Sequence, residues 1–303
     1  HRAAPVQYIR PEVIGLILGA YALSIIRGEH QSKGGSSPII RFILGFFVMI
    51  GSLMFLGCPL RMILRLGGGD LNAIFGILGF AGGVGIGTIF LKRGYSLQRT
   101  YALSKLESAM MPAIQVALLI LLVAAPAFIL LSQKGPGSMH APWLISLVAG
   151  LVVGGLAQLS RLCTVGGFRD LFLFKKSILI FGYLAVLIGV FVVNISFGNF
   201  HLGFENQPIA HTDGLWNFLG MALAGFCSVL LGGCPLRQLF MTGEGNSDSA
   251  VTVLGLAAGA AFAHNFGLAA SGAGPTLNGE IAVVVGFIVA LIIAVVNTKR
   301  ANA

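Results

Sequence analysis

The sequence predicts an all-α integral membrane protein, an inverted-repeat bundle of about nine transmembrane helices with short re-entrant or broken half-helices. Three observations support this fold class. The 303 residues are 56% hydrophobic and only 10% charged. Apolar stretches long enough to cross a bilayer recur along the chain, and the string Gly-Cys-Pro-Leu-Arg occurs twice. Buried helices of a soluble protein would need polar outer faces, which these segments lack.

The predicted spans are runs of about 20 predominantly apolar residues, because a helix of this length crosses the hydrocarbon core of a bilayer. Nine such segments are expected, at residues 11–27, 39–57, 73–91, 110–131, 143–159, 177–197, 215–233, 250–270 and 279–297. The 43 glycines of the chain favour close packing between these helices.

An internal duplication relates the two halves of the chain. The two Gly-Cys-Pro-Leu-Arg strings start at Gly57 and Gly233, which are 176 residues apart. At this offset, and without gaps, residues 57–83 and 233–259 are identical at 11 of 27 positions. Duplications of this kind are a frequent construction of membrane transporters.

The duplication divides the chain into a first repeat at residues 1–131, an external loop at 132–142 and a second, inverted repeat at 143–303. Each predicted span of the first repeat has a counterpart 176 residues later, and the span at 143–159 is left without one. We therefore expect a further span before residue 1. Each repeat would then hold an odd number of spans, so that the two repeats cross the membrane in opposite directions.

The net charge of +9 follows the membrane topology and does not indicate a nucleic-acid partner. When the C-terminus is placed in the cytoplasm, 14 of the 19 Lys and Arg fall in cytoplasmic segments and five in external ones. Positive charge is normally concentrated on that side. The sequence therefore predicts a multi-pass protein of the cell (inner or plasma) membrane, in contact with the lipid bilayer, with a cytoplasmic C-terminus.

Each Gly-Cys-Pro-Leu-Arg string closes a long apolar run, and its proline cannot continue the preceding helix. Proline is favourable in the first turn of a new helix, so short helices are expected at 59–66 and 235–242. Broken helices at membrane depth occur where they line a cavity, and the N-terminus of a half-helix attracts an anion. Cys58 and Cys234 would lie at these two points.

Two questions stay open for these strings. Arg61 and Arg237 add positive charge either to the substrate or to acidic side chains of the protein. One such string alone would also fit a proline-kinked helix with a buried cysteine that only packs. The matched second copy favours a functional role for Cys58 and Cys234.

The third candidate element surrounds Cys163. The glycine pair Gly166-Gly167 is expected to permit another helix break, and Arg169 is expected to form an ion pair with Asp170 that locks the turn. The alternative is a simple cytoplasmic loop whose arginines follow the topology.

Two further side chains lie within predicted spans. Cys227 precedes Cys234 by seven residues, about two helical turns, so both could face one groove, although packing is the simpler role for Cys227. His264 is a polar group in a span and therefore a functional candidate, or else its ring bonds a neighbouring carbonyl. The four cysteines form no Cys-x-x-Cys pair, so no disulfide framework, metal site or other cofactor is expected.

The Gly-Cys-Pro strings and the motif Arg-Leu-Cys…Gly-Gly-Phe-Arg-Asp at 161–170 resemble the YeeE/YedE family of sulfur-compound transporters. The resemblance covers essentially the whole chain and is nearest to the YedE branch of selenium transporters. It implies an inverted-repeat protein whose short helices dip from both faces toward a central constriction. It also implies that cysteines on this path contact the substrate sulfur; by position these are Cys58, Cys163 and Cys234.

The expected function is transport, without enzymatic activity, of a small inorganic solute: a selenium species or a thiosulfate-like sulfur anion. The residues expected on its path are Cys58, Cys163, Cys234, Arg61, Arg237, Arg169, Cys227 and His264. The alternative is a membrane thiol enzyme, or a sulfur or selenium relay that hands its substrate to a cytosolic sulfurtransferase-like protein. That alternative requires a reactive thiolate, for which Cys234 is the best candidate.

Overall fold

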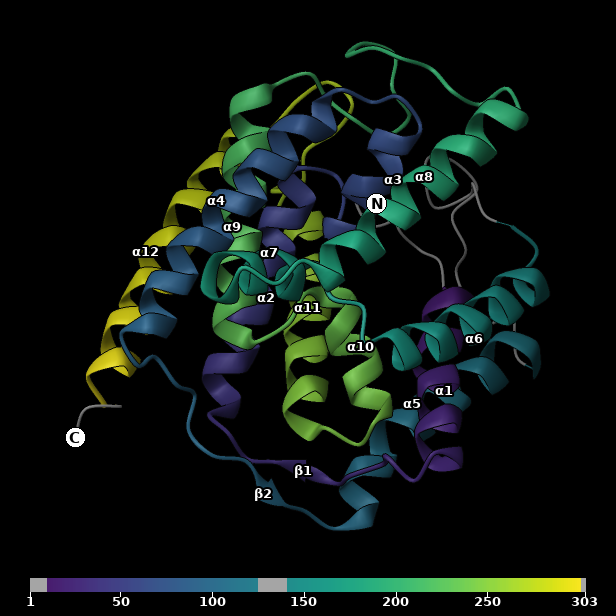
Figure 1. The fold of residues 1–303 in the computed structure, drawn as a ribbon, viewed down its shortest axis with the longest axis vertical. Coiled ribbons are helices and arrows are strands. Elements are labelled where there is room, and N and C mark those ends of the chain that lie inside the picture. The colour runs from purple at the N-terminus through teal and green to yellow at the C-terminus, as the bar shows by residue number, and fades with distance from the viewer. Residues whose placement is uncertain (1–9, 125–140, 301–303) are drawn as a thin grey trace. The chain divides into compact units, whose positions relative to one another are not determined.

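The computed structural model describes residues 10–124 and 141–300 (Figure 1). Its helices are α1 (Pro11–Ile26), α2 (Pro38–Met54), α3 (Pro59–Gly67), α4 (Asn72–Lys92), α5 (Lys105–Ala124), α6 (Trp143–Ser160), α7 (Thr164–Phe174), α8 (Ile178–Ser196), α9 (Gly214–Leu231), α10 (Pro235–Gly243), α11 (Ser247–Asn265) and α12 (Leu277–Arg300). Two short strands, β1 (Lys33–Gly34) and β2 (Tyr101–Ala102), pair antiparallel.

The predicted fold class, an all-α multi-pass membrane protein, is confirmed. Within the described residues, seven helical stretches are long and apolar enough to cross a membrane. The predicted span at 11–27 is a shorter apolar helix of 16 residues. The span predicted at 250–270 corresponds to α11, which is not among the seven and begins with the polar run Ser-Asp-Ser. The end of the span at 110–131 and most of the loop at 132–142 lie outside the described residues.

Three of the seven stretches are interrupted helices. The interruptions separate α2 from α3, α6 from α7, and α9 from α10. The short helices predicted at 59–66 and 235–242 are α3 and α10, and each is one residue longer than predicted. The glycine turns that follow them also match, because Gly69 and Gly245 both adopt a positive φ, of 99° and 95°.

The chain forms two compact units, each of which draws on both predicted repeats. Of the described residues, unit 1 comprises 10–38, 98–124, 141–162 and 237–253, and unit 2 comprises 39–97, 163–236 and 254–300. In unit 1, α1 packs closely on α6. Both helices have a glycine at the contact. A Cβ on Gly15 would collide with the backbone of α6, and a Cβ on Gly150 would collide with the backbone of α1. These small residues allow the close backbone approach that membrane helices use.

In unit 2, the most extensive helix contact joins α4 to α9, and α12 packs beside both (Figure 1). The large side chains Phe55, Phe80 and Phe226 are completely or almost completely buried in this unit. Gly79 and Gly83 of α4 lie directly against the backbone carbonyl oxygens of Phe218 and Ala222 of α9, where a side chain would collide with them.

The same contact recurs at the offset of the duplication. Gly255 and Gly259 of α11 lie against the backbone carbonyl oxygens of Phe42 and Phe46 of α2. Each of these four residues lies 176 positions from its equivalent in the contact between α4 and α9. Each copy therefore supplies the glycine helix of one contact and the carbonyl helix of the other. Reciprocal contacts of this kind are a property of two-fold arrangements.

The close contact between α4 and α9 yields a matched test. Gly79→Ala places a methyl group against the carbonyl of Phe218, so the helices must separate, and overpacking of this kind costs about 1–3 kcal/mol. We expect a lower melting temperature in detergent. The control Gly82→Ala lies in the same helix, where the added Cβ meets only one ring atom at 3.9 Å, and it should melt like the wild type. Equal melting temperatures for the two variants would contradict the packing described here.

Candidate functional site

Three short helices begin immediately after a cysteine. Cys58 precedes α3, Cys163 precedes α7 and Cys234 precedes α10. Cys163 is the N-cap of its helix, with its sulfur accepting a hydrogen bond from the backbone N–H of Gly166 at 3.3 Å. Each sulfur therefore lies at the positive end of a helix, where the helix dipole and N–H groups that lack a partner within the helix favour negative charge.

The structure brings these cysteines together in unit 2. The sulfur atoms of Cys163 and Cys234 are 4.0 Å apart, and both side chains are buried. Cys58 is half-buried and lies within electrostatic range of Cys234.

Both Cys-Pro breaks are built on the same backbone turn. Leu56 and Gly232, which are equivalent at the offset of 176, have left-handed φ values of 63° and 82°. The N–H of Gly57 then donates to the carbonyl of Ser52 at 2.8 Å, and the N–H of Gly233 to that of Ser228 at 3.0 Å. This is the Schellman arrangement that ends many helices. It stops α2 and α9 before the proline of each string starts the next helix.

The third break differs from the one predicted. Gly166 and Gly167 lie inside α7 and do not interrupt it. The break lies earlier, where Arg161 takes a left-handed φ of 53° and Cys163 caps the new helix. The glycine pair instead makes room for α8, because a Cβ on Gly166 would come within 2.8 Å of Leu179.

A buried arginine, Arg65, ties the end of α2 to α3. Its Nη1 donates to the carbonyl of Phe55 at 2.6 Å, its guanidinium lies 4.0 Å from the centre of the Phe55 ring, and its Nε donates to Asp70 at 2.6 Å. The side chains of Arg65 and Asp70 are only 6% and 3% exposed. A backbone carbonyl freed by the helix break is thus paired with a charged donor, as a buried polar group requires.

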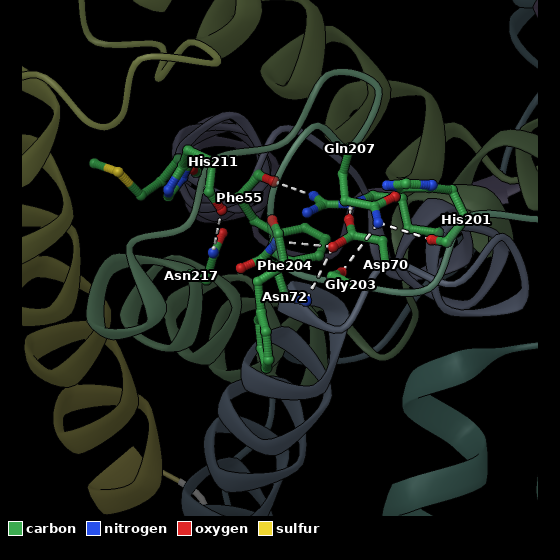
Figure 2. A network of polar contacts seen from close by, with 11 residues as sticks. Phe55, Asp70, Asn72, His201, Gly203, Phe204, Gln207, His211 and Asn217 are labelled. Carbon is green, nitrogen blue, oxygen red and sulfur yellow. Dashed lines mark hydrogen bonds and ion pairs between the residues drawn. The ribbon is translucent and has the colours of Figure 1, made fainter.

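Asp70 extends this network to the loop before α9 (Figure 2). Its second carboxylate oxygen accepts hydrogen bonds from the backbone N–H and side-chain amide of Asn72, both at 2.9 Å, and that amide also donates to the carbonyl of Phe204 at 2.7 Å. Gln207 donates to the carbonyls of His201 and Gly203 at 2.8 and 3.0 Å. The loop is therefore fixed to the turn that follows α3.

The same loop also holds the C-terminal end of α2 (Figure 2). Burial lowers the pKa of His211, so its ring is neutral near pH 7. Nε2 carries the proton, because it donates to the carbonyl of Met54 at 2.8 Å. The side-chain amide of Asn217 donates to the carbonyl of His211 at 3.0 Å. Both sides of the helix break before Cys58 are therefore anchored to one loop.

Arg237, predicted to face either the substrate or an acidic side chain, is paired with an acidic side chain in unit 1. Its Nη1 lies 3.2 Å from Glu244, and Arg161 binds the same carboxylate oxygen. Arg161 also pairs with Glu29 at 2.8 Å. The pKa of Glu29 is lowered, mainly because Arg27 donates a hydrogen bond to it, so this carboxylate is ionised at neutral pH.

The other predicted residues have separate environments. The aliphatic part of the Arg61 side chain packs against Gly57. Its Cδ atom is 2.9 Å from the position that a Cβ would take on residue 57. Arg169 pairs with Asp170 at 2.9 Å, as predicted. Cys227 is completely buried within α9, in agreement with the packing role. His264 is half-buried in the last turn of α11.

Two hydroxyl residues beside the thiols were missed by the sequence analysis. Thr164 and Tyr183 are hydrogen-bonded to each other, and both are buried. The sequence does contain a signal for Tyr183. Apart from the serine at its end, the apolar helix α8 has only two side chains with a polar group, Tyr183 and Asn194. The partner of Tyr183 could not be predicted, since it lies 19 residues earlier in another helix.

Comparisons with known proteins bear on the same elements. The sulphur transport family (Sulf_transp) matches residues 159–301. This similarity is to the second half of the chain. The thiosulfate transporter TsuA of Escherichia coli (strain K12) is 30% identical over 111 residues, which cover 35% of this chain and 30% of that protein's length. The YeeE/YedE resemblance is thus confirmed, while membership of its selenium branch stays a prediction.

The buried ion pair yields a second matched test. Asp70→Asn keeps the size of the side chain but leaves Arg65 charged and unpaired, and such a loss costs about 3–5 kcal/mol. The melting temperature in detergent should fall by several degrees. Glu12→Gln is the control, because it breaks the more exposed ion pair between Arg10 and Glu12. These two side chains are 57% and 35% exposed, respectively, and losing such a pair costs at most about 1 kcal/mol. Similar melting temperatures for the two variants would show that the Arg65 network does not hold the break.

Proposed function

We propose that this protein is a transporter that passes a small sulfur- or selenium-containing anion along the thiols of Cys58, Cys163 and Cys234. One observation carries the proposal: two buried thiols lie 4.0 Å apart at the N-termini of two half-helices, in a chain whose residues 159–301 match a sulphur transport family.

An anion is attracted to this place by the backbone. The N-termini of α3, α7 and α10 carry N–H groups without helical partners, and these favour negative charge. Since the site is buried, the attraction is screened less than at a surface. Thiols in an apolar helix bundle without these helix N-termini would not attract an anion in this way.

The thiols then provide weak and polarizable contacts. A thiol is a poor hydrogen-bond donor and a soft contact atom, which suits the terminal sulfur or selenium of a substrate. The sulfur atoms of Cys163 and Cys234 are only 4.0 Å apart. One substrate atom can therefore move from contact with the first thiol to contact with the second. Several weak sites in series permit entry without trapping, as in other selective pores.

The identity of the anion is part of the proposal. TsuA of E. coli is named a thiosulfate transporter, so we propose a thiosulfate-like anion as the first substrate and a selenium species as the second. We also propose an inner-membrane location with a cytoplasmic C-terminus, and a cytosolic sulfurtransferase-like acceptor for the delivered sulfur.

The inverted repeat completes the proposal. The reciprocal glycine contacts of α4 with α9 and of α11 with α2 support a two-fold relation between the copies. An inverted pair would direct half-helix N-termini at the substrate from opposite faces, as in other transporters with broken helices.

Substitution of the path cysteines tests the transport proposal. Cys58→Ala, Cys163→Ala and Cys234→Ala should each lower the initial uptake of ³⁵S-thiosulfate into proteoliposomes by about tenfold, the effect of losing a contact worth about 1.4 kcal/mol. Cys227→Ala is the matched control, because this thiol is buried like those of Cys163 and Cys234 but lies inside α9, and it should retain wild-type uptake.

Unchanged uptake in all three path variants would contradict the proposal. Chemical conversion of thiosulfate by the purified protein in detergent, where no membrane separates two compartments, would favour the thiol enzyme or relay instead.

A further inference from the structure

A pair of buried hydroxyl groups lies beside the proposed path. Tyr183 is the one buried residue of α8, all of which the structure describes. Its hydroxyl is hydrogen-bonded to that of Thr164, the first residue of α7. Their exposed fractions are 7% and 1%. The other residues of α8 are half-buried or exposed, so Tyr183 is the side chain of this helix that reaches farthest into the interior of unit 2.

The hydrogen count of this pair leaves one donor available. Two hydroxyl groups carry two hydrogens, and the bond between them uses one. Within the described residues, neither hydroxyl has a second partner that accepts the remaining hydrogen. A buried donor of this kind normally finds an acceptor, and a bound substrate with oxygen atoms would supply one.

The hydroxyls and the thiols share one location. The Tyr183 hydroxyl is hydrogen-bonded to that of Thr164. Thr164 follows Cys163 directly in the chain, and that cysteine is 4.0 Å from Cys234. The interior of unit 2 therefore combines two kinds of donor: soft S–H groups and hard O–H groups.

These two kinds of donor suit an anion with two different ends. An O–H group bonds a charged oxygen strongly, whereas a thiol is the better contact for sulfur or selenium. A chalcogen oxyanion with a terminal sulfur or selenium offers both ends. Hydrosulfide and hydroselenide contain no oxygen, so they would offer the hydroxyl donor only a sulfur or selenium atom, which is a weaker acceptor than a charged oxygen.

We propose that Tyr183 and Thr164 form an oxygen-recognition subsite next to the three thiols, and that they select a chalcogen oxyanion over a bare chalcogenide. This inference rests on the transport function proposed above. The hydroxyl pair orients the anion, with its oxygen end at Tyr183 and its terminal sulfur or selenium toward Cys163 and Cys234.

The test compares variants that lack one hydroxyl. Tyr183→Phe keeps the ring and its packing, and it should raise the KM for ³⁵S-thiosulfate uptake into proteoliposomes by about tenfold, because a hydrogen bond to an anionic oxygen is lost. Thr164→Val should act in the same direction, and Thr164→Ser, which keeps the hydroxyl, should restore the wild-type KM. The matched control is Tyr95→Phe, because Tyr95 is equally buried, at 7%, and should leave KM unchanged.

A second readout separates recognition from a structural role. Inhibition of thiosulfate uptake by hydrosulfide should be the same in the wild type and in Tyr183→Phe, because this competitor has no oxygen to lose contact with. An unchanged KM for thiosulfate in Tyr183→Phe would overturn the inference. So would a parallel loss of hydrosulfide inhibition, which would mean that the hydroxyl only shapes the site.

Parallel assays of the wild type and of Cys234→Ala distinguish this inference from the function on which it rests. If the wild type takes up no thiosulfate, or if its uptake does not depend on Cys234, the transport proposal fails and the subsite fails with it. If uptake depends on Cys234 while Tyr183→Phe behaves like the wild type, only the oxygen-recognition subsite is refuted.

Discussion

The structure depends on one constraint: two long apolar helices must end inside the protein, immediately before a cysteine and a proline. Ending a helix away from water leaves backbone groups that need partners. The Schellman turns at Leu56 and Gly232 satisfy part of this need within the backbone. The proline that follows each cysteine then starts a new helix, whose first N–H groups cannot pair with a carbonyl of the preceding helical turn. The cysteines are consequently placed at positive helix ends by the backbone alone.

The two copies of the duplication share this backbone but support it with different side chains. In the first copy, Arg65 and Asp70 form the buried pair; their equivalents in the second copy are Met241 and Asn246. The second copy has Glu244 where the first has Gly68, and this carboxylate binds two arginines in unit 1. Duplication thus preserved the helix breaks, while the charges around them diverged. This asymmetry fits a path whose two ends face different solutions.

The breaks could be predicted from the sequence because their cause is local. Proline and glycine act on their own backbone, so α3 and α10 were expected to within one residue. The pairing of Thr164 with Tyr183, and of Arg65 with the carbonyl of Phe55, depends on how helices pack, which no local rule gives. The break near Cys163 was misplaced for a related reason. Gly166 and Gly167 permit a turn, but here they serve the approach of α8, and the capping sulfur of Cys163 decides where α7 begins.

The most direct test of this account is a crystal structure of the protein with selenosulfate, in which anomalous scattering locates the selenium atom. The account predicts a selenium peak in contact with the sulfur atoms of Cys163 and Cys234, with the oxygen atoms of the anion on the side of Tyr183. A peak elsewhere in the protein, or uninterrupted helices through Cys58 and Cys234, would contradict it.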